Sequence, residues 1–211
     1  MTITEPSTLV TDLLLSGSSL WFALRLTRQA RSTRRRSIAL WAAATLAGGA
    51  AALAGGIYHG FGEAIGSGPA ALLWKGTVWL AGVSSLTSLS GSLTATIPGR
   101  PRRPLIGLVW LKFAVYAFWM AGHDDFRYVV YDQLTAMTAI LILHARDMST
   151  GKDPAGRFMV TAVLVSLLAA ILQQSGIDPH RHFNHNDLFH LVQIGANYLF
   201  FRGALLLSDL D

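Results

Sequence analysis

The segment HFNHNDLFHLVQIGANYLFFRGALLL, residues 182–207, decides how this chain must fold. Its first nine residues include three histidines, two asparagines and one aspartate, and the rest is apolar enough for a membrane helix. A polar stripe follows the helical spacing along this apolar segment: Asn186, His190, Gln193 and Asn197. Such a stripe cannot face lipid, so it must point into a bundle interior or a wet cavity. Ionisable groups in that setting predict a functional site.

The composition indicates an integral membrane protein. Hydrophobic residues make up 52% of the chain and charged residues only 14%, which is too apolar for a soluble domain. The absence of cysteine excludes disulfides and thiolate metal sites, so a metal would be held by His, Asp, Glu or Asn. Lys and Arg number 17 against 12 acids. Their distribution points to membrane orientation, so we expect membrane lipids as partners and no nucleic acid.

Seven segments are apolar and long enough to cross a hydrocarbon core, which takes about 20 residues per helix. They are Leu9–Leu26, Ile38–Tyr58, Ala70–Leu89, Leu105–Gly122, Tyr128–Leu143, Phe158–Leu172 and Leu188–Leu207. Residues 1–8 have no Lys or Arg, unlike a signal peptide, so the first helix is expected to be retained. The sequence thus predicts an all-α fold, a seven-transmembrane-helix bundle that forms a single domain over residues 1–211.

Basic residues set the expected orientation. The link 25–36 contains six arginines, and the positive-inside rule places it in the cytoplasm. Alternation of the helices then puts further basic residues on the same side: Arg100, Arg102, Arg103, Arg146, Lys152 and Arg157. The opposite ends hold only Lys75, Arg127 and Arg181. We expect a multi-pass protein of the cell (inner) membrane, with its N-terminus outside and its C-terminus in the cytoplasm.

This topology gathers ionisable residues at the outer side. His59 ends the second expected helix, and Asp132 lies near the start of the fifth. Asp12 begins an interior-facing stripe on the first helix, together with Ser16 and Ser19. Lys75, near the outer end of the third, either snorkels to the interface or pairs with Asp12 or Asp132.

Imidazoles and carboxylates without sulfur suit Zn²⁺ or iron. Three protein ligands and an open position would lower the pKa of a bound water to about 7, which is a hydrolase arrangement. His59 and His190 are the best ligand candidates, and His185 is the natural third. An ideal helix would place His185 about 140° from His190, so we expect it in the loop or a distorted first turn.

Other residues of the cluster have two interpretations. Asp187 or Asn186 could replace His185 as a ligand, and Asp132 or Asp187 could act as the general base. Alternatively, histidines flanked by Asn and Asp are solvated loop residues, with Asn184 or Asn186 as the helix N-cap and Asp187 favoured by the helix dipole.

Seven helices with a histidine ending the second and a histidine-rich start to the seventh resemble a superfamily of membrane hydrolases. It joins alkaline ceramidases with progestin/adiponectin-type receptors. Its members hold zinc with one His of helix 2 and a His-x3-His pair at the start of helix 7. They also have a Ser four residues before the first His and an Asp in helix 3. The resemblance implies that His59 and His190 are zinc ligands and that the substrate is a lipid amide or ester at the outer face.

The chain departs from this pattern at three positions. Asn186 stands four residues before His190, Gly55 stands four before His59, and the third span offers Lys75 with no Asp. Either His185 takes the missing ligand place, or this branch has lost the zinc or changed its chemistry.

Two alternatives to a zinc hydrolase remain open. One is a proton- or ion-linked transporter or channel with these relay groups: Asp12, Lys75, Asp132 and His190. The other is a haem-binding membrane protein with His59 and His190 as axial ligands. The second span also carries glycines at small-residue spacing, which we expect to serve close helix packing: Gly48, Gly49, Gly55 and Gly56.

Overall fold

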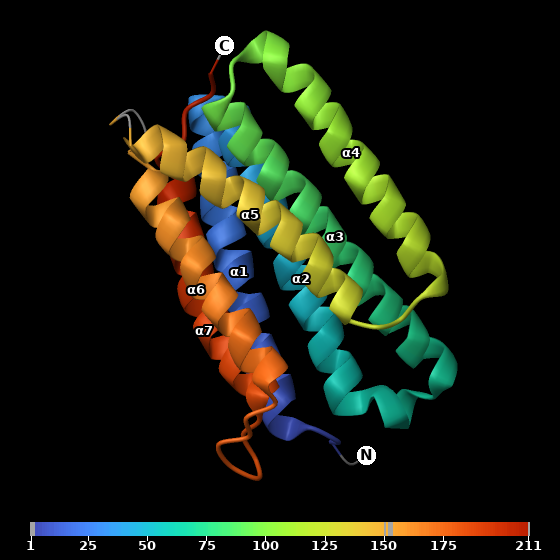
Figure 1. The fold of residues 1–211 in the computed structure, drawn as a ribbon. Coiled ribbons are helices and arrows are strands. Elements are labelled where there is room, and N and C mark those ends of the chain that lie inside the picture. Colours follow the sequence, from blue (N-terminus) through green and yellow to red (C-terminus); the bar gives the residue numbers. More distant parts are fainter. Residues whose placement is uncertain (1–2, 150, 152–153, 211) are drawn as a thin grey trace.

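A computed structural model gives the fold and describes residues 3–149, 151 and 154–210. It contains seven α-helices (Figure 1). They are α1 (Pro6–Thr33), α2 (Arg36–Ile65), α3 (Ser67–Thr96), α4 (Gly99–Gly122), α5 (Arg127–Ser149), α6 (Gly156–Ser175) and α7 (His185–Ala204). The all-α prediction is confirmed, and each expected span falls on one helix. Only the seventh is displaced, since α7 begins and ends three residues before the predicted segment.

A capping box explains the early start of α7. The side chain of Asn184 accepts hydrogen bonds from the backbone N–H groups of Asn186 and Asp187, at 2.8 and 3.2 Å. Asp187 in turn accepts from the backbone N–H of Asn184 at 2.8 Å. These bonds satisfy donors that a helix start otherwise leaves unpaired. His185 is therefore the first residue of α7, and the expectation that it lies in the loop or a distorted turn is wrong.

Five helices are long and apolar enough to cross a membrane, as in a multi-pass membrane protein: α1, α2, α4, α5 and α6. The other two, α3 and α7, both carry buried polar groups. In α3 these are buried hydroxyls that bond within the helix, as when Thr94 donates to the Ser90 carbonyl and Thr96 to that of Ser92, both at 2.8 Å. Such internal bonding satisfies hydroxyls away from water.

Six helices form a closed ring. Neighbours around it are α1, α2, α3, α5, α6 and α7, and α7 packs back against α1. Helix α4 lies outside the ring against α3 (Figure 1). The side of α4 away from α3 is apolar and exposed, with Phe118 85% accessible, as expected of a lipid-facing surface.

Glycines let α2 approach α1 closely. A Cβ added at Gly56 would lie 2.7 Å from the Cβ of Asp12, and one at Gly49 would lie 2.9 Å from the Cβ of Ser19. These separations are too short for any side chain, so only glycine permits this spacing. The prediction that the glycines serve helix packing is confirmed at these two positions.

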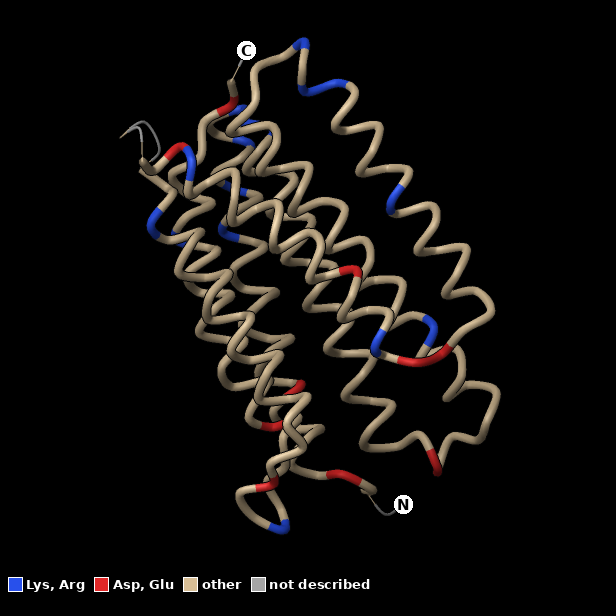
Figure 2. Tube along the Cα trace, viewed as in Figure 1, with Lys and Arg blue, Asp and Glu red and all other residues tan. Residues whose placement is uncertain are grey.

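Most Lys and Arg residues gather at one end of the bundle, next to the C-terminus (Figure 2). The C-terminal tail is fastened there, because Asp209 accepts hydrogen bonds from the backbone N–H groups of Arg36 and Ser37 at 2.7 and 2.9 Å. Asp209 thus caps the first turn of α2 from the far end of the chain. Arg35 adds a hydrogen bond to the Leu207 carbonyl at 2.7 Å.

Candidate ligand cavity

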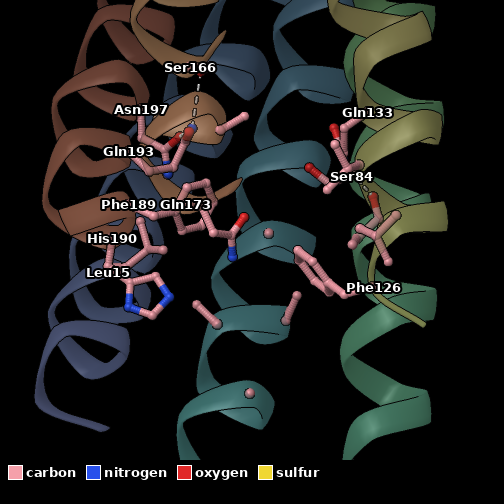
Figure 3. A pocket seen from close by; sticks show the side chains of 18 of the residues that line it. Leu15, Ser84, Phe126, Gln133, Ser166, Gln173, Phe189, His190, Gln193 and Asn197 are labelled. Carbon is pink, nitrogen blue, oxygen red and sulfur yellow. Dashed lines mark hydrogen bonds between the residues drawn. The ribbon is translucent and has the colours of Figure 1, made fainter. Parts of the chain in front are cut away.

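The ring surrounds a partly open cavity of about 650 Å³, within the range of small-molecule sites. Its walls come from all six ring helices, and its apolar surface includes Leu15, Trp41, Phe126, Phe189 and Phe200. Polar side chains face one another across it (Figure 3). The polar stripe predicted on the last helix lines this cavity, which confirms that it points inward: Asn186, His190, Gln193 and Asn197.

A buried hydrogen-bonded network lies in the wall between α1 and α7. His190 Nε2 lies 3.2 Å from Asp12 Oδ1, and His190 Nδ1 lies 2.9 Å from the hydroxyl of Thr11. The same hydroxyl is 3.1 Å from Asp187 Oδ1. All four side chains belong to buried residues, and both Asp12 and His190 line the cavity. The chain thus links Asp187, Thr11, His190 and Asp12 in that order.

The 3.2 Å contact between His190 Nε2 and Asp12 Oδ1 can be a hydrogen bond only where one of the two atoms carries a hydrogen. The Thr11 hydroxyl either accepts from Nδ1–H of His190 or donates to Nδ1. If Thr11 donates, neutral His190 carries its hydrogen on Nε2 and donates it to Asp12. If Thr11 accepts, a second hydrogen must lie on Nε2 or on Asp12 Oδ1 for the 3.2 Å contact to be a hydrogen bond. Asp12 and His190 therefore form a pair that can hold and release one proton.

Asp12 Oδ2 is buried and has no hydrogen-bond partner within the described part of the chain. It lies over Gly56 of α2, 3.6 Å from where a Cβ would be. An unpaired buried carboxylate oxygen is costly, which is typical of functional positions in membrane helices.

Amide side chains form further polar parts of the cavity wall. On α7, the Gln193 amide donates to Ser166 of α6 at 3.2 Å and to Asn197 at 2.9 Å. Asn197 donates on to Ser19 of α1 at 3.1 Å. Gln133 of α5 stands on the opposite side (Figure 3) and donates to the Ala81 carbonyl of α3 at 2.8 Å.

A third buried acid, Asp132, lies outside the cavity wall. Asp132 of α5 pairs with Lys112 of α4 at 2.6 Å, and Lys112 also donates to Ser85 of α3 at 2.9 Å. Asp132 is not among the cavity-lining residues described. The structure does not bring it to His190, so a role as general base at that histidine would need another geometry.

Lys75 has different partners from those expected. Its ammonium lies 2.6 Å from Asp124 and donates to the Met120 carbonyl at 2.7 Å and the His123 carbonyl at 3.0 Å. The expectation of a pair with Asp12 or Asp132 is therefore wrong. Helix α4 ends next to α3, and its terminal carbonyls attract the cation.

The three predicted metal ligands all line the cavity, yet each has its own partner. His59 Nδ1 lies 3.4 Å from Glu5, and His185 Nδ1 lies 2.9 Å from Asp178. That hydrogen bond from His185 lowers the pKa of Asp178, which lies in the loop before α7. Over residues 3–149, 151 and 154–210, no three His, Cys, Asp or Glu side chains are grouped so that they could hold a metal ion. As arranged, these side chains do not fit a three-ligand zinc site.

Sequence reasoning missed three residues that shape these networks: Thr11, Lys112 and Gln133. Lys112 carried a signal, because a lysine inside an apolar span must find a partner. Thr11 precedes Asp12 but lies about 100° from it around the helix, so the stripe of Asp12 did not include it. Gln133 follows Asp132 and was overlooked for the same reason.

The fold and cavity define a class: a helical bundle of membrane type with a central cavity whose mostly apolar lining carries several polar side chains. Over residues 7–209 the chain matches a family model described as "Family of unknown function (DUF6962)", and it belongs to that family. A comparison with curated proteins finds no match, and a comparison with solved structures finds none.

Proposed function

We propose that this protein is a seven-transmembrane, proton-linked carrier of a small amphipathic molecule, with its N-terminus outside and its C-terminus in the cytoplasm. The observation that carries the function is the Asp12–His190 pair, a 3.2 Å contact in the cavity wall between two groups that can share one transferable proton. Buried ionisable pairs facing a cavity are typical of proton relays in transporters. The basic end of the bundle supports the orientation (Figure 2).

The cavity suits an amphipathic cargo because parts of its wall are apolar and other parts are polar. Aromatic rings such as Phe126, Phe189 and Phe200 can cover an apolar body, and the Gln133 and Gln193 amides can bind a polar group. In the carrier cycle, the ligand would bind as the Asp12–His190 pair releases its proton. Reprotonation of the pair would then favour dissociation of the ligand. Coupling then follows, because each event changes the charge that the other meets.

Transport in proteoliposomes tests this function. Vesicles with an entrapped pH-sensitive dye would receive phenylalkyl compounds of matched size that carry a hydroxyl, a carboxylate, a primary ammonium or a quaternary ammonium. We expect at least one compound to drive a proton movement in wild-type vesicles that is absent with Asp12→Asn. The control is Glu63→Gln, an exposed carboxylate that is neutralised in the same way. Equal proton movement in wild-type and Asp12→Asn vesicles for every compound would refute the carrier.

Reporter fusions test the orientation. A reporter after Asp211 is expected in the cytoplasm and one after Ser7 outside. Both reporters on one side would mean an even number of spans.

A zinc-dependent hydrolase of a lipid amide or ester is the second candidate, favoured by the fact that His59, His185 and His190 line one cavity. Here Asp187 would be the general base, because Asp132 pairs with Lys112 outside the cavity wall. The hypothesis requires bound metal in the purified protein, loss of that metal in His190→Ala, and a lower Tm with a chelator, because metal that binds only the folded state stabilises it. A metal-free active protein with an unchanged Tm would exclude it, and visible absorbance tests the haem expectation in the same sample.

A further inference from the structure

The charge of the cavity lining indicates which ligands it can hold. No Lys or Arg is present among the cavity-lining residues described, and the ionisable ones are Asp12, His59, His185 and His190. A ligand anion would meet no fixed positive charge. A ligand cation would meet the Asp12 carboxylate once its proton has left. A charged group inside a membrane protein needs such a counter-charge.

The Gln133 amide further restricts the class of ligand that the cavity can bind. Its Nε2 donates to the backbone carbonyl of Ala81, and a carbonyl can only accept, so the orientation of the amide is fixed. The Oε1 atom is then left without a partner among the residues that the structure describes. Gln133 therefore presents a hydrogen-bond acceptor to the cavity, and a ligand that bonds to it must carry a hydrogen-bond donor.

Gln193 also presents a hydrogen-bond acceptor to the cavity, from the opposite wall (Figure 3). Both hydrogens of its amide are used, one towards Ser166 and one towards Asn197. Its Oε1 is thus an acceptor without a partner in the described chain. Two hydroxyls of the cavity wall are also acceptors only. Thr45 and Ser88 donate their hydrogens to carbonyls of their own helices, so only their lone pairs remain for a ligand.

Aromatic rings supply a third feature that suits a cation. The cavity wall includes Trp41, Trp74, Phe126, Phe189 and Phe200. The faces of aromatic rings attract ammonium groups, and Trp attracts them best. The same rings cover apolar surface, so one ligand with an ammonium head and an apolar body would use the whole lining.

We propose that the ligand is a small primary ammonium compound with an apolar body, and that it exchanges one-for-one with the proton of the Asp12–His190 pair. The proposal rests on the proposed carrier function and names its substrate class. Its N–H groups donate to the amide oxygen of Gln133, and Asp12 supplies the counter-charge.

The exchange balances in protons and charge. With its shared proton the pair is neutral overall, whether the proton resides on Asp12 or on His190. When the proton leaves for bulk water, neutral His190 and the Asp12 carboxylate remain, and the incoming ammonium restores neutrality. The other ionisable groups around the Asp12–His190 pair are His59 on α2, Asp187 on α7 and Glu5 before α1.

Calorimetry on the purified full-length protein in detergent tests the proposal. The probes are 2-phenylethylammonium, 2-phenylethanol and 3-phenylpropanoate, which have similar bodies and differ in head group. We expect the ammonium to bind about tenfold or more tightly than either of the others, the difference that hydrogen bonds to a charged group confer. Titrations in buffers of different ionisation enthalpy should show about one proton released per ligand bound.

Two variants separate the groups involved. Asp12→Asn should weaken binding of the ammonium by about tenfold or more and remove the proton release. Gln133→Met should weaken it by about three- to tenfold and leave the proton release unchanged, because it removes an acceptor only. Glu63→Gln is the matched control for the first variant and should bind as wild type.

The outcomes distinguish this proposal from the carrier itself. Tighter binding of the alcohol or the carboxylate, or ammonium binding that Asp12→Asn does not change, would overturn the ammonium assignment and leave a carrier of another ligand. Absence of ammonium binding would overturn it as well. Only the further result that no compound moves protons in vesicles would overturn the carrier.

Discussion

Asp12 and Asp132 are both buried acids with one oxygen that accepts no hydrogen bond in the described part of the chain, but they differ in partner. Asp12 meets His190 in the cavity wall, whereas Asp132 meets Lys112 between α3, α4 and α5. Lys112 bonds both Asp132 and Ser85, so that pair links three helices. A histidine can gain or lose a proton near neutral pH. The comparison indicates that the partner of a buried acid, a histidine or a lysine, and not burial alone, decides whether that acid can take part in proton transfer.

Exchanging the two acids for amides gives the largest expected contrast. Asp12→Asn should reduce proton-linked uptake by about tenfold or more, because the amide cannot release a proton into the pair. Asp132→Asn should retain most of the uptake, since it lies outside the cavity wall. Uptake by the two variants in the same vesicle preparation checks this, with protein amount measured for each. Equal losses in both would remove the distinction between the pairs.

Lys112→Met tests the structural role of the other pair. Removing the cation leaves Asp132 buried and unpaired, which should cost about 3 kcal/mol of unfolding free energy. The double variant Lys112→Met with Asp132→Leu should regain most of the loss, because no buried charge then remains. Thermal unfolding in detergent measures both. A double variant as unstable as the single one would show that the charges themselves do not account for the loss.

Gly56→Ala tests the close approach of α2 to Asp12. The added methyl would lie 2.7 Å from the Asp12 Cβ, so the helices must separate at a cost of about 1–3 kcal/mol. Gly17→Ala is the matched control, because nothing lies within 4 Å of its added Cβ. Its Tm should stay the same or rise slightly. A Tm for Gly56→Ala equal to that of the control would contradict the close packing.

Asp209→Asn should have the smallest effect, about 1 kcal/mol, as for loss of a helix cap. Partial burial by itself would raise the pKa of Asp209, but hydrogen bonds from Ser37 and Arg36 and the charge of Arg102 outweigh it and lower the pKa. A lowered pKa contributes stability above the ordinary Asp value, and this is lost as pH falls through the lowered pKa. The Tm difference from wild type should therefore be full at about pH 6 and shrink below about pH 4. A difference independent of pH would exclude this carboxylate effect.

Local pattern was sufficient for much of the fold. Apolar runs placed a helix in each expected segment, because a 3.6-residue period and span length depend on neighbouring residues. The Asn184 cap and the inward stripe through His190 and Asn197 were also predictable, since both follow from spacing along one helix. Gly49 and Gly56 indicated close packing for the same reason.

What the sequence by itself determined is the helices, their apolar and polar faces, and the fact that His190 and Asp12 must point inward. Only the tertiary structure decided which faces meet: that α7 closes the ring on α1, so that Thr11 bonds His190, and that α4 lies outside it, so that Lys112 reaches Asp132. The physical reason is that spacing along one helix fixes the direction of a side chain around that helix. The neighbour it meets depends on the order of helices around the ring, which is set by packing among all of them.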